Sequence, residues 1–227
     1  MEYGKLITVK KEKRTNMSNV LFIVDPGHGG VINGINQSKD GKYSPKFKDG
    51  TRFYEGVNNR DNAKRLIDHL SAIGVECVDV TGGSDLDIPL AKRVSTANKL
   101  GSGRNSLYIS IHSDAQGNGE EWMPASGISV YTSVGQTKSD SFATILISEL
   151  ETEFKQTVKW RQDTADGDKD KESNFFVLKN TLMPAVLIEA GFHTNETEVK
   201  RMMTDDWKIK LVNAITNACL KWEELVV

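Results

Sequence analysis

The sequence predicts a single α/β domain built on a mostly parallel, twisted sheet with helices on both faces. Short apolar runs rich in β-branched residues recur along the chain, as is typical of strands buried on both faces. Segments with apolar residues at helical spacing separate most of these runs, which is the order expected of parallel strands joined by helices. The 227 residues, 38% hydrophobic and 26% charged, suffice for one core and contain no internal repeat or linker that would divide it.

The chain opens with a segment that we do not expect to join this domain. Residues 1–18 are polar and charged without an apolar period, which predicts a flexible N-terminal arm followed by a domain over 19–227. The first strand is predicted at 20–24 and ends at Asp25-Pro26-Gly27. Residues 29–53 hold five glycines and a proline with little periodicity, so we expect a long surface loop that covers a site.

The rest of the domain alternates between the two patterns. Helical spacing predicts a helix over 58–73, one that Asp87 caps and that continues to about 97, one from about 142 to 154, and one at the C-terminus that contains 214–222. Short apolar runs predict strands at 75–80, 107–111, 128–132 and 185–188. The order is that of a parallel sheet covered on both faces.

Composition and charge exclude several classes of partner. The 29 Lys and Arg residues against 31 Asp and Glu give a net charge of −2, which provides no basic surface for nucleic acid. No apolar stretch is long enough to cross a membrane, so we expect no membrane partner. No signal peptide is visible, because residues 1–16 lack an apolar core, and we expect synthesis in the cytoplasm.

Cys77 and Cys219 are expected to be buried free thiols.

Polar residues of one chemical kind follow three of the predicted strands. His28 follows the first strand, His112 follows the run Leu107–Ile111, and Glu189 follows Ala185–Ile188. The carboxyl ends of parallel strands meet at one edge of a sheet, so these side chains are expected to converge there. Two imidazoles with carboxylates indicate a zinc site.

A hydrolytic zinc site needs a third protein ligand and a separate proton carrier. Glu55 and Glu189 are the candidates. Glu55 stands at the end of the long loop, just before the first helix, where it can reach the end of the first strand. We assign Glu55 as the third ligand and Glu189 as general acid and base, although composition alone does not choose between them.

A set of motifs then extends this interpretation. It comprises Asp25–Gly30, Tyr54-Glu55, Leu90 with Arg93 and Ala97-Asn98, Ser110–His112, and Pro184–Phe192 followed by Asn195. From about residue 19 to 222, the chain resembles the zinc-dependent N-acetylmuramoyl-L-alanine amidases of the autolysin and endolysin type.

The resemblance implies an enzyme. It places one zinc ion on His28, Glu55 and His112, gives Glu189 the catalytic role, and makes 19–227 an amidase catalytic domain. The implied activity is hydrolysis of the amide between N-acetylmuramic acid and L-alanine in peptidoglycan, by a monomer that reaches the wall after host lysis or export. A zinc peptidase that cuts the stem peptide and a non-catalytic wall-binding module are the alternatives. A non-catalytic module would be expected to lack a zinc ligand or Glu189. The three ligands and Glu189 are all present, which favours the enzyme.

Three features extend or depart from the family pattern. Asp114 stands where the family commonly has Asn, and it orients His112, binds the metal itself or caps a turn. His193 replaces a small apolar residue, and we expect a second proton carrier or a substrate contact there. Basic residues are candidates to hold the anionic substrate, although a solvated surface is equally compatible with them. They are Lys39, Lys42, Lys46, Lys48, Arg52 and Arg161.

Overall fold

The computed structural model describes residues 19–38, 41–165 and 167–226. The expected arm, 1–18, lies outside the described residues. The strands are β1 (Leu21–Pro26), β2 (Val31–Ile32), β3 (Ile35–Asn36), β4 (Cys77–Asp79), β5 (Ser106–Asp114), β6 (Ser129–Thr132), β7 (Lys171–Glu172) and β8 (Ala185–Phe192). The helices are α1 (Glu55–Ala72), α2 (Leu90–Leu100), α3 (Lys138–Phe154), α4 (Phe176–Asn180), α5 (Glu196–Met202) and α6 (Asp205–Val226).

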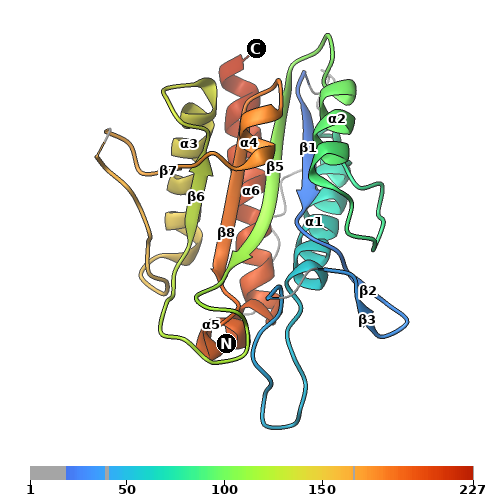
Figure 1. The fold of residues 1–227 in the computed structure, drawn as a ribbon. Coiled ribbons are helices and arrows are strands. Elements are labelled where there is room, and N and C mark those ends of the chain that lie inside the picture. The colour runs from blue at the N-terminus through green and yellow to red at the C-terminus, as the bar shows by residue number, and fades with distance from the viewer. Residues whose placement is uncertain (1–18, 39–40, 166, 227) are drawn as a thin grey trace.

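The main sheet has six strands in the order β4-β1-β5-β8-β6-β7. Its pairings are parallel except that of β6 with β8, which is antiparallel. The predicted fold class, a mostly parallel sheet in one α/β domain, is therefore confirmed. β1, β5 and β8 run side by side in one direction, so their carboxyl ends lie at one edge of the sheet (Figure 1).

Alternating residues of the central strands face two separate cores. In β1, Phe22 and Val24 pack into the core with α1, α3 and α6, whereas Leu21 and Ile23 pack toward α2 and α4. This period-two pattern within a fully buried strand is why an uninterrupted apolar run predicts β1 correctly. Helices therefore cover both faces of the sheet, as Figure 1 shows.

Some details differ from the sequence-based expectation. Asp87 does not cap α2, because Pro89 holds the N-cap position without a side-chain hydrogen bond and Asp87 instead lies 3.5 Å from Arg93. The β2–β3 hairpin, β7, α4 and α5 were not predicted, because each is too short to show a period. Cys219 is a buried free thiol as expected, whereas Cys77 is only partly buried. Within the part of the chain that the structure describes, no helix is long and apolar enough to cross a membrane.

Candidate active site

The turn after β1 brings one histidine over the end of β5. Gly27 N–H donates to the Ile111 carbonyl at 3.0 Å, and His28 follows with a φ of 63°, in the left-handed region. A Cβ on Gly27 would lie only 2.1 Å from Cε1 of His112. Glycine at this position is therefore what lets the His28 and His112 rings approach, with their centroids 4.9 Å apart.

A buried arginine of α2 holds this turn in place. The Arg93 guanidinium donates to Asp25 Oδ1 at 2.5 Å and to the carbonyls of Pro26, His28 and Ile88 at 2.7, 2.9 and 2.8 Å. Arg93 and Asp25 are each only 1% exposed. Burial alone would raise the pKa of Asp25, but the charge of Arg93 lowers it overall, so the carboxylate stays ionised. The arginine thus fixes the backbone that carries His28.

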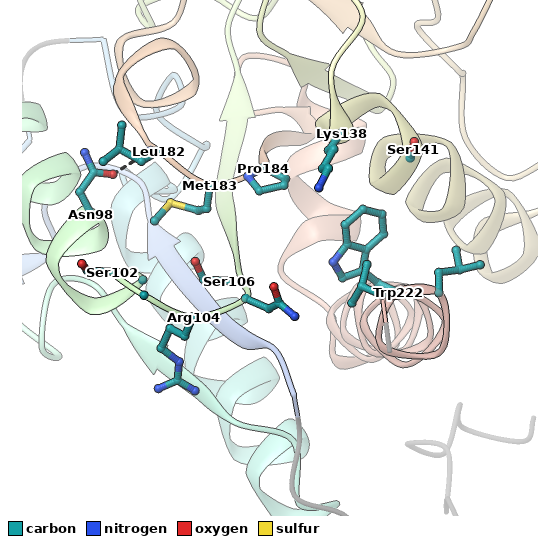
Figure 2. Close-up of a pocket in the computed structure, with 15 residues that line it drawn as sticks. Asn98, Ser102, Arg104, Ser106, Lys138, Ser141, Leu182, Met183, Pro184 and Trp222 are labelled. Atoms are coloured by element: carbon teal, nitrogen blue, oxygen red, sulfur yellow. Dashed lines mark hydrogen bonds between the residues drawn. The ribbon is translucent and has the colours of Figure 1, made fainter.

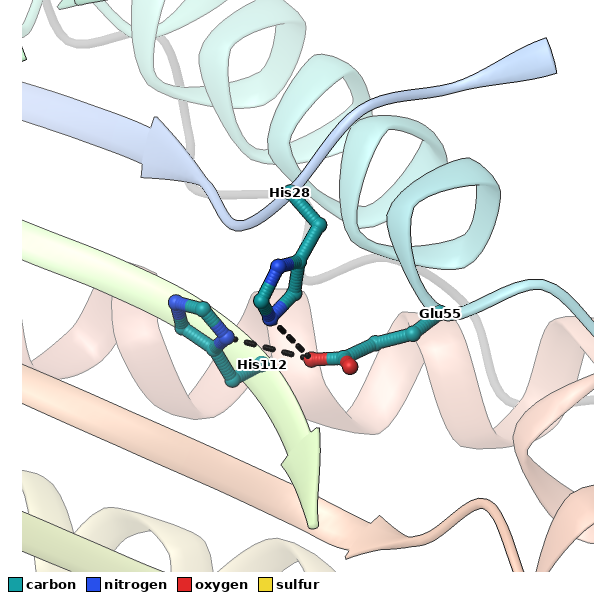
Figure 3. A group of neighbouring side chains, drawn as sticks. All are labelled: His28, Glu55 and His112. Atoms are coloured by element: carbon teal, nitrogen blue, oxygen red, sulfur yellow. Dashed lines mark hydrogen bonds and ion pairs between the residues drawn. The ribbon is translucent and has the colours of Figure 1, made fainter. Parts of the chain in front are cut away.

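Glu55, in the first turn of α1, lies between the two histidines. Its Oε1 is 3.1 Å from His112 Nδ1 and 3.4 Å from His28 Nε2 (Figure 3). The same oxygen accepts the Ser113 N–H at 3.2 Å. One ligand atom from each of His28, Glu55 and His112 lies within 4.8 Å of the other two. Three segments that are distant in the sequence thus present two nitrogens and a carboxylate to one point.

The protonation states suit a cation at this point. Burial lowers the pKa of His28 to about 3, so its imidazole is neutral at neutral pH and has a lone pair to offer. Burial would raise the pKa of Glu55, but the hydrogen bond with His112 is the largest of the effects that lower it overall. Its second oxygen, Oε2, is buried and has no hydrogen-bond partner among the described residues.

Glu189 faces the same space from β8. Its backbone is in register with His112 across the β5–β8 pairing, and both line a cavity of about 380 Å³ together with Glu55 and Asp114. Burial first, and then the charges of Glu55 and Asp114, raise the pKa of Glu189 well above its usual range. Its Oε2 is buried without a hydrogen-bond partner among the described residues. This carboxyl group is therefore placed to hold and release a proton.

The two departures from the family pattern have different environments. Asp114 Oδ1 accepts the Ala115 N–H at 2.8 Å, so the structure shows the turn-capping role and no hydrogen bond to the His112 ring. His193 is fully buried; its Nε2–H donates to the Gly41 carbonyl at 3.0 Å, and its Nδ1 lies 3.0 Å from the Ser113 hydroxyl. Its Nδ1 also lies 3.8 Å from Glu55 Oε2, so His193 supports the site from behind Glu55, and the expected proton-carrier or substrate-contact role stays a prediction. His193 also ties the long loop to the end of β5.

Of the basic residues considered from the sequence, Lys42 lines the cavity, with its Nζ 3.9 Å from Glu55 Oε2. Arg52 is paired with Glu120 at 3.0 Å, and Arg161 stacks over the Phe192 ring. Those two are therefore engaged elsewhere. The proximity of Gly41 and Lys42 to Glu55 agrees with the expectation that the 29–53 loop covers a site.

Two contributions were missed from the sequence. Ser113 supplies a backbone N–H to Glu55, which no side-chain pattern reveals. Arg93 was noted only as part of a motif, although an arginine next to the apolar face formed by Val94 and Ala97 is a usable signal for a buried ion pair.

A larger hollow, about 800 Å³, lies at the opposite edge of the sheet, between the end of α2, the start of β5 and the end of α6. Figure 2 shows Arg104, Lys138 and Trp222 around it. None of the proposed metal ligands lines it, so size alone does not mark the site.

With this geometry in view, the chain can be compared with known proteins. A family model described as N-acetylmuramoyl-L-alanine amidase matches residues 22–221, and the chain belongs to this family. It is 26% identical over 201 residues to the N-acetylmuramoyl-L-alanine amidase LytC of Bacillus subtilis, covering 88% of this chain and 35% of LytC. It is 23% identical over 227 residues to an uncharacterized cell wall amidase of Bacillus anthracis, covering 96% of this chain and 38% of that protein. The chain thus spans little more than a third of these two relatives.

A solved structure gives the same placement. The crystal structure of N-acetylmuramoyl-L-alanine amidase from Clostridium difficile 630 superposes with a TM-score of 0.73 at 26% identity, covering 91% of this chain and 98% of that one. The family resemblance expected from the motifs is confirmed.

Proposed function

We propose that this chain hydrolyses the amide that joins the lactyl group of N-acetylmuramic acid to L-alanine in peptidoglycan. The observation that carries the proposal is the convergence of His28, Glu55 and His112 in an amidase-family domain, where Glu55 and His112 share one cavity with Glu189. We place the domain at 19–227, and expect it to act on the wall as a monomer, after host lysis as an endolysin or after export as an autolysin.

We assign one zinc ion to His28, Glu55 and His112. The donors fit zinc, because two neutral imidazole nitrogens and one carboxylate form a three-ligand set of the catalytic type. Glu55 Oε2 is buried and has no hydrogen-bond partner among the described residues, with the Lys42 ammonium no nearer than 3.9 Å. A buried carboxylate oxygen without a hydrogen-bond donor is costly, which also favours a cation here. When bound, zinc would polarise the scissile carbonyl and lower the pKa of a water to about 7.

Glu189 is proposed to move the protons. Its unpartnered Oε2 takes a proton from the attacking water and delivers it to the nitrogen of the departing alanine. Burial and the neighbouring charges of Glu55 and Asp114 hold the pKa of Glu189 high, so the protonated form is stable enough to act as the acid in the second step.

Lys42 gives the cavity a cation at its rim. Its side chain is 36% exposed, so its ammonium group can bind an anionic group of the muramyl peptide without a rearrangement of the loop. We propose that Lys42 binds the substrate and takes no part in the proton transfer.

The alternative that needs an experiment is a peptidase acting within the stem peptide, because the same residues would perform that reaction. Purified sacculi should be digested with the zinc-loaded protein and the products separated and identified by mass spectrometry. Stem peptides with a free L-alanine amino group, released from intact glycan, are expected. Fragments cut inside the stem peptide would identify a peptidase, and no zinc-dependent product from the wild type would favour a wall-binding module.

A further inference from the structure

A second acidic cluster lies apart from the proposed zinc site and shares no residue with it. Asp140 is in the first turn of α3, and Asp168 and Asp170 lie in the segment that leads into β7. One carboxylate oxygen from each of the three lies within 4.8 Å of the other two. The hydroxyl of Thr132, the last residue of β6, donates to Asp170 Oδ2 at 2.6 Å. The cluster therefore joins β6, α3 and the approach to β7, at the side of the sheet where Figure 1 shows the long segment between α3 and β7.

The negative charge of this cluster is not compensated by the described residues. No ion pair recorded in that part of the chain involves Asp140, Asp168 or Asp170. The two adjacent lysines point elsewhere: Lys169 binds Glu151 at 2.8 Å, and Lys171 lies over the Tyr131 ring. Three carboxylates are thus held together with no cation beside them.

One oxygen of the innermost carboxylate also lacks a hydrogen-bond donor. Asp170 is only 1% exposed, and its Oδ1 has no hydrogen-bond partner among the described residues. Asp168 Oδ1 is likewise buried and unpartnered. A buried anionic oxygen without a donor is costly, and two that lie in one cluster with Asp140 point to a missing positive ligand.

A proton is one such ligand. Burial first, and then the neighbouring Asp168 and Asp140, raise the pKa of Asp170 to about 7, even though the Thr132 hydroxyl opposes the shift. A single proton at neutral pH would neutralise one carboxylate in part and leave the other two charged. A divalent cation would contact all three.

We infer that Asp140, Asp168 and Asp170 bind one Ca²⁺ ion. All three donors are carboxylate oxygens, which hard cations such as Ca²⁺ and Mg²⁺ prefer. Zinc sites commonly include imidazole nitrogens, and this cluster has none. Ca²⁺ accepts irregular sets of carboxylate oxygens, whereas Mg²⁺ demands a near-ideal octahedron. Three carboxylates supplied by the first turn of α3 and by the irregular segment before β7 therefore favour Ca²⁺. The ion would fasten the segment before β7 to the start of α3.

This site is separate from the proposed zinc site. Ser129, at the other end of β6, pairs with Glu189, and Thr132 lies three residues further along the strand, about 10 Å away. The inference therefore stands or falls independently of the amidase activity.

The test is calorimetric titration and thermal unfolding of the zinc-loaded protein at pH 7.5, with calcium chloride as the probe and magnesium chloride as the comparison. One calcium ion per chain is expected to bind, and 5 mM calcium is expected to raise the melting temperature by about 5 °C. Asp170→Asn should abolish both the calcium binding and the rise in melting temperature. Asp168→Asn, which alters only a half-buried position, should do the same. Asp163→Asn, which removes an exposed carboxylate of the same segment, should retain them.

Three results would overturn the inference. The first is no calcium binding by the wild type, which would leave a shared proton as the occupant. The second is undiminished binding by Asp168→Asn and Asp170→Asn. An equal response to magnesium would exclude calcium as the preferred ion.

Discussion

Replacing Arg93 by methionine removes the buried cation that holds the His28 turn while keeping much of the side-chain volume. The change leaves Asp25, which is 1% exposed, as an uncompensated buried charge whose remaining hydrogen-bond donors include the Ser110 hydroxyl at 2.7 Å. It also removes the donors to the carbonyls of Pro26, His28 and Ile88. Breaking a buried ion pair from one side costs about 3–5 kcal/mol.

The expected loss of stability is therefore about 3–5 kcal/mol, which corresponds to a fall in melting temperature of about 6–20 °C for a chain of this size. His28 should also lose its fixed position, since its left-handed φ is held by the hydrogen bond from Arg93 to its carbonyl. Zinc affinity is expected to fall with it.

Urea unfolding of the zinc-free protein measures the first effect without a contribution from metal binding, and zinc titration measures the second. Lys92→Met is the matched control, because it removes the same charge from an exposed neighbour on α2. A change below about 1 kcal/mol in Arg93→Met would refute the reasoning, since it would show that Asp25 is not an uncompensated buried charge in the variant.

Three further predictions follow from the same contacts. Glu189→Gln should retain zinc, measured by elemental analysis, but lower the rate on sacculi by about 100- to 10,000-fold, and loss of zinc would instead make Glu189 a ligand. Asp114→Asn removes a charge that raises the pKa of Glu189, so the acidic limb of the pH profile of kcat/KM should move to lower pH. Zinc affinity should stay unchanged, because asparagine can still cap the turn, and a large loss of zinc would contradict the turn-capping role. Gly56→Ala would place a Cβ 1.8 Å from the Gly29 carbonyl oxygen and should cost about 3 kcal/mol in urea unfolding, whereas the exposed Val57→Ala should cost little, and equal stabilities would argue against this close approach.

The sequence predicted the fold where burial produces a simple pattern. β1, β5 and β8 are buried along nearly their whole length, so each appears as an apolar run, and the rule that parallel strand ends converge then placed His28, His112 and Glu189 at one edge. Short elements such as α4 and α5 are fixed by tertiary contacts and carry too few residues for a period.

The site was less predictable where it depends on packing between distant segments. Glu55 reaches the histidines from the start of α1, after a long loop, so residue types alone left it equal to Glu189. Neither the burial of His193 nor its bond to Gly41 follows from the sequence, because both depend on how that loop folds back. The cluster of Asp140 with Asp170 likewise brings together residues thirty positions apart by the pairing of β6 with β7.

The convergence of His28, Glu55 and His112 on one zinc ion is tested most directly by anomalous diffraction at the zinc edge, from crystals grown with zinc. The expected result is one strong peak in contact with both imidazoles and the Glu55 carboxylate, with Glu189 nearby but not bound. A peak that includes Glu189 in place of Glu55, or no peak between the two histidines, would contradict the assignment.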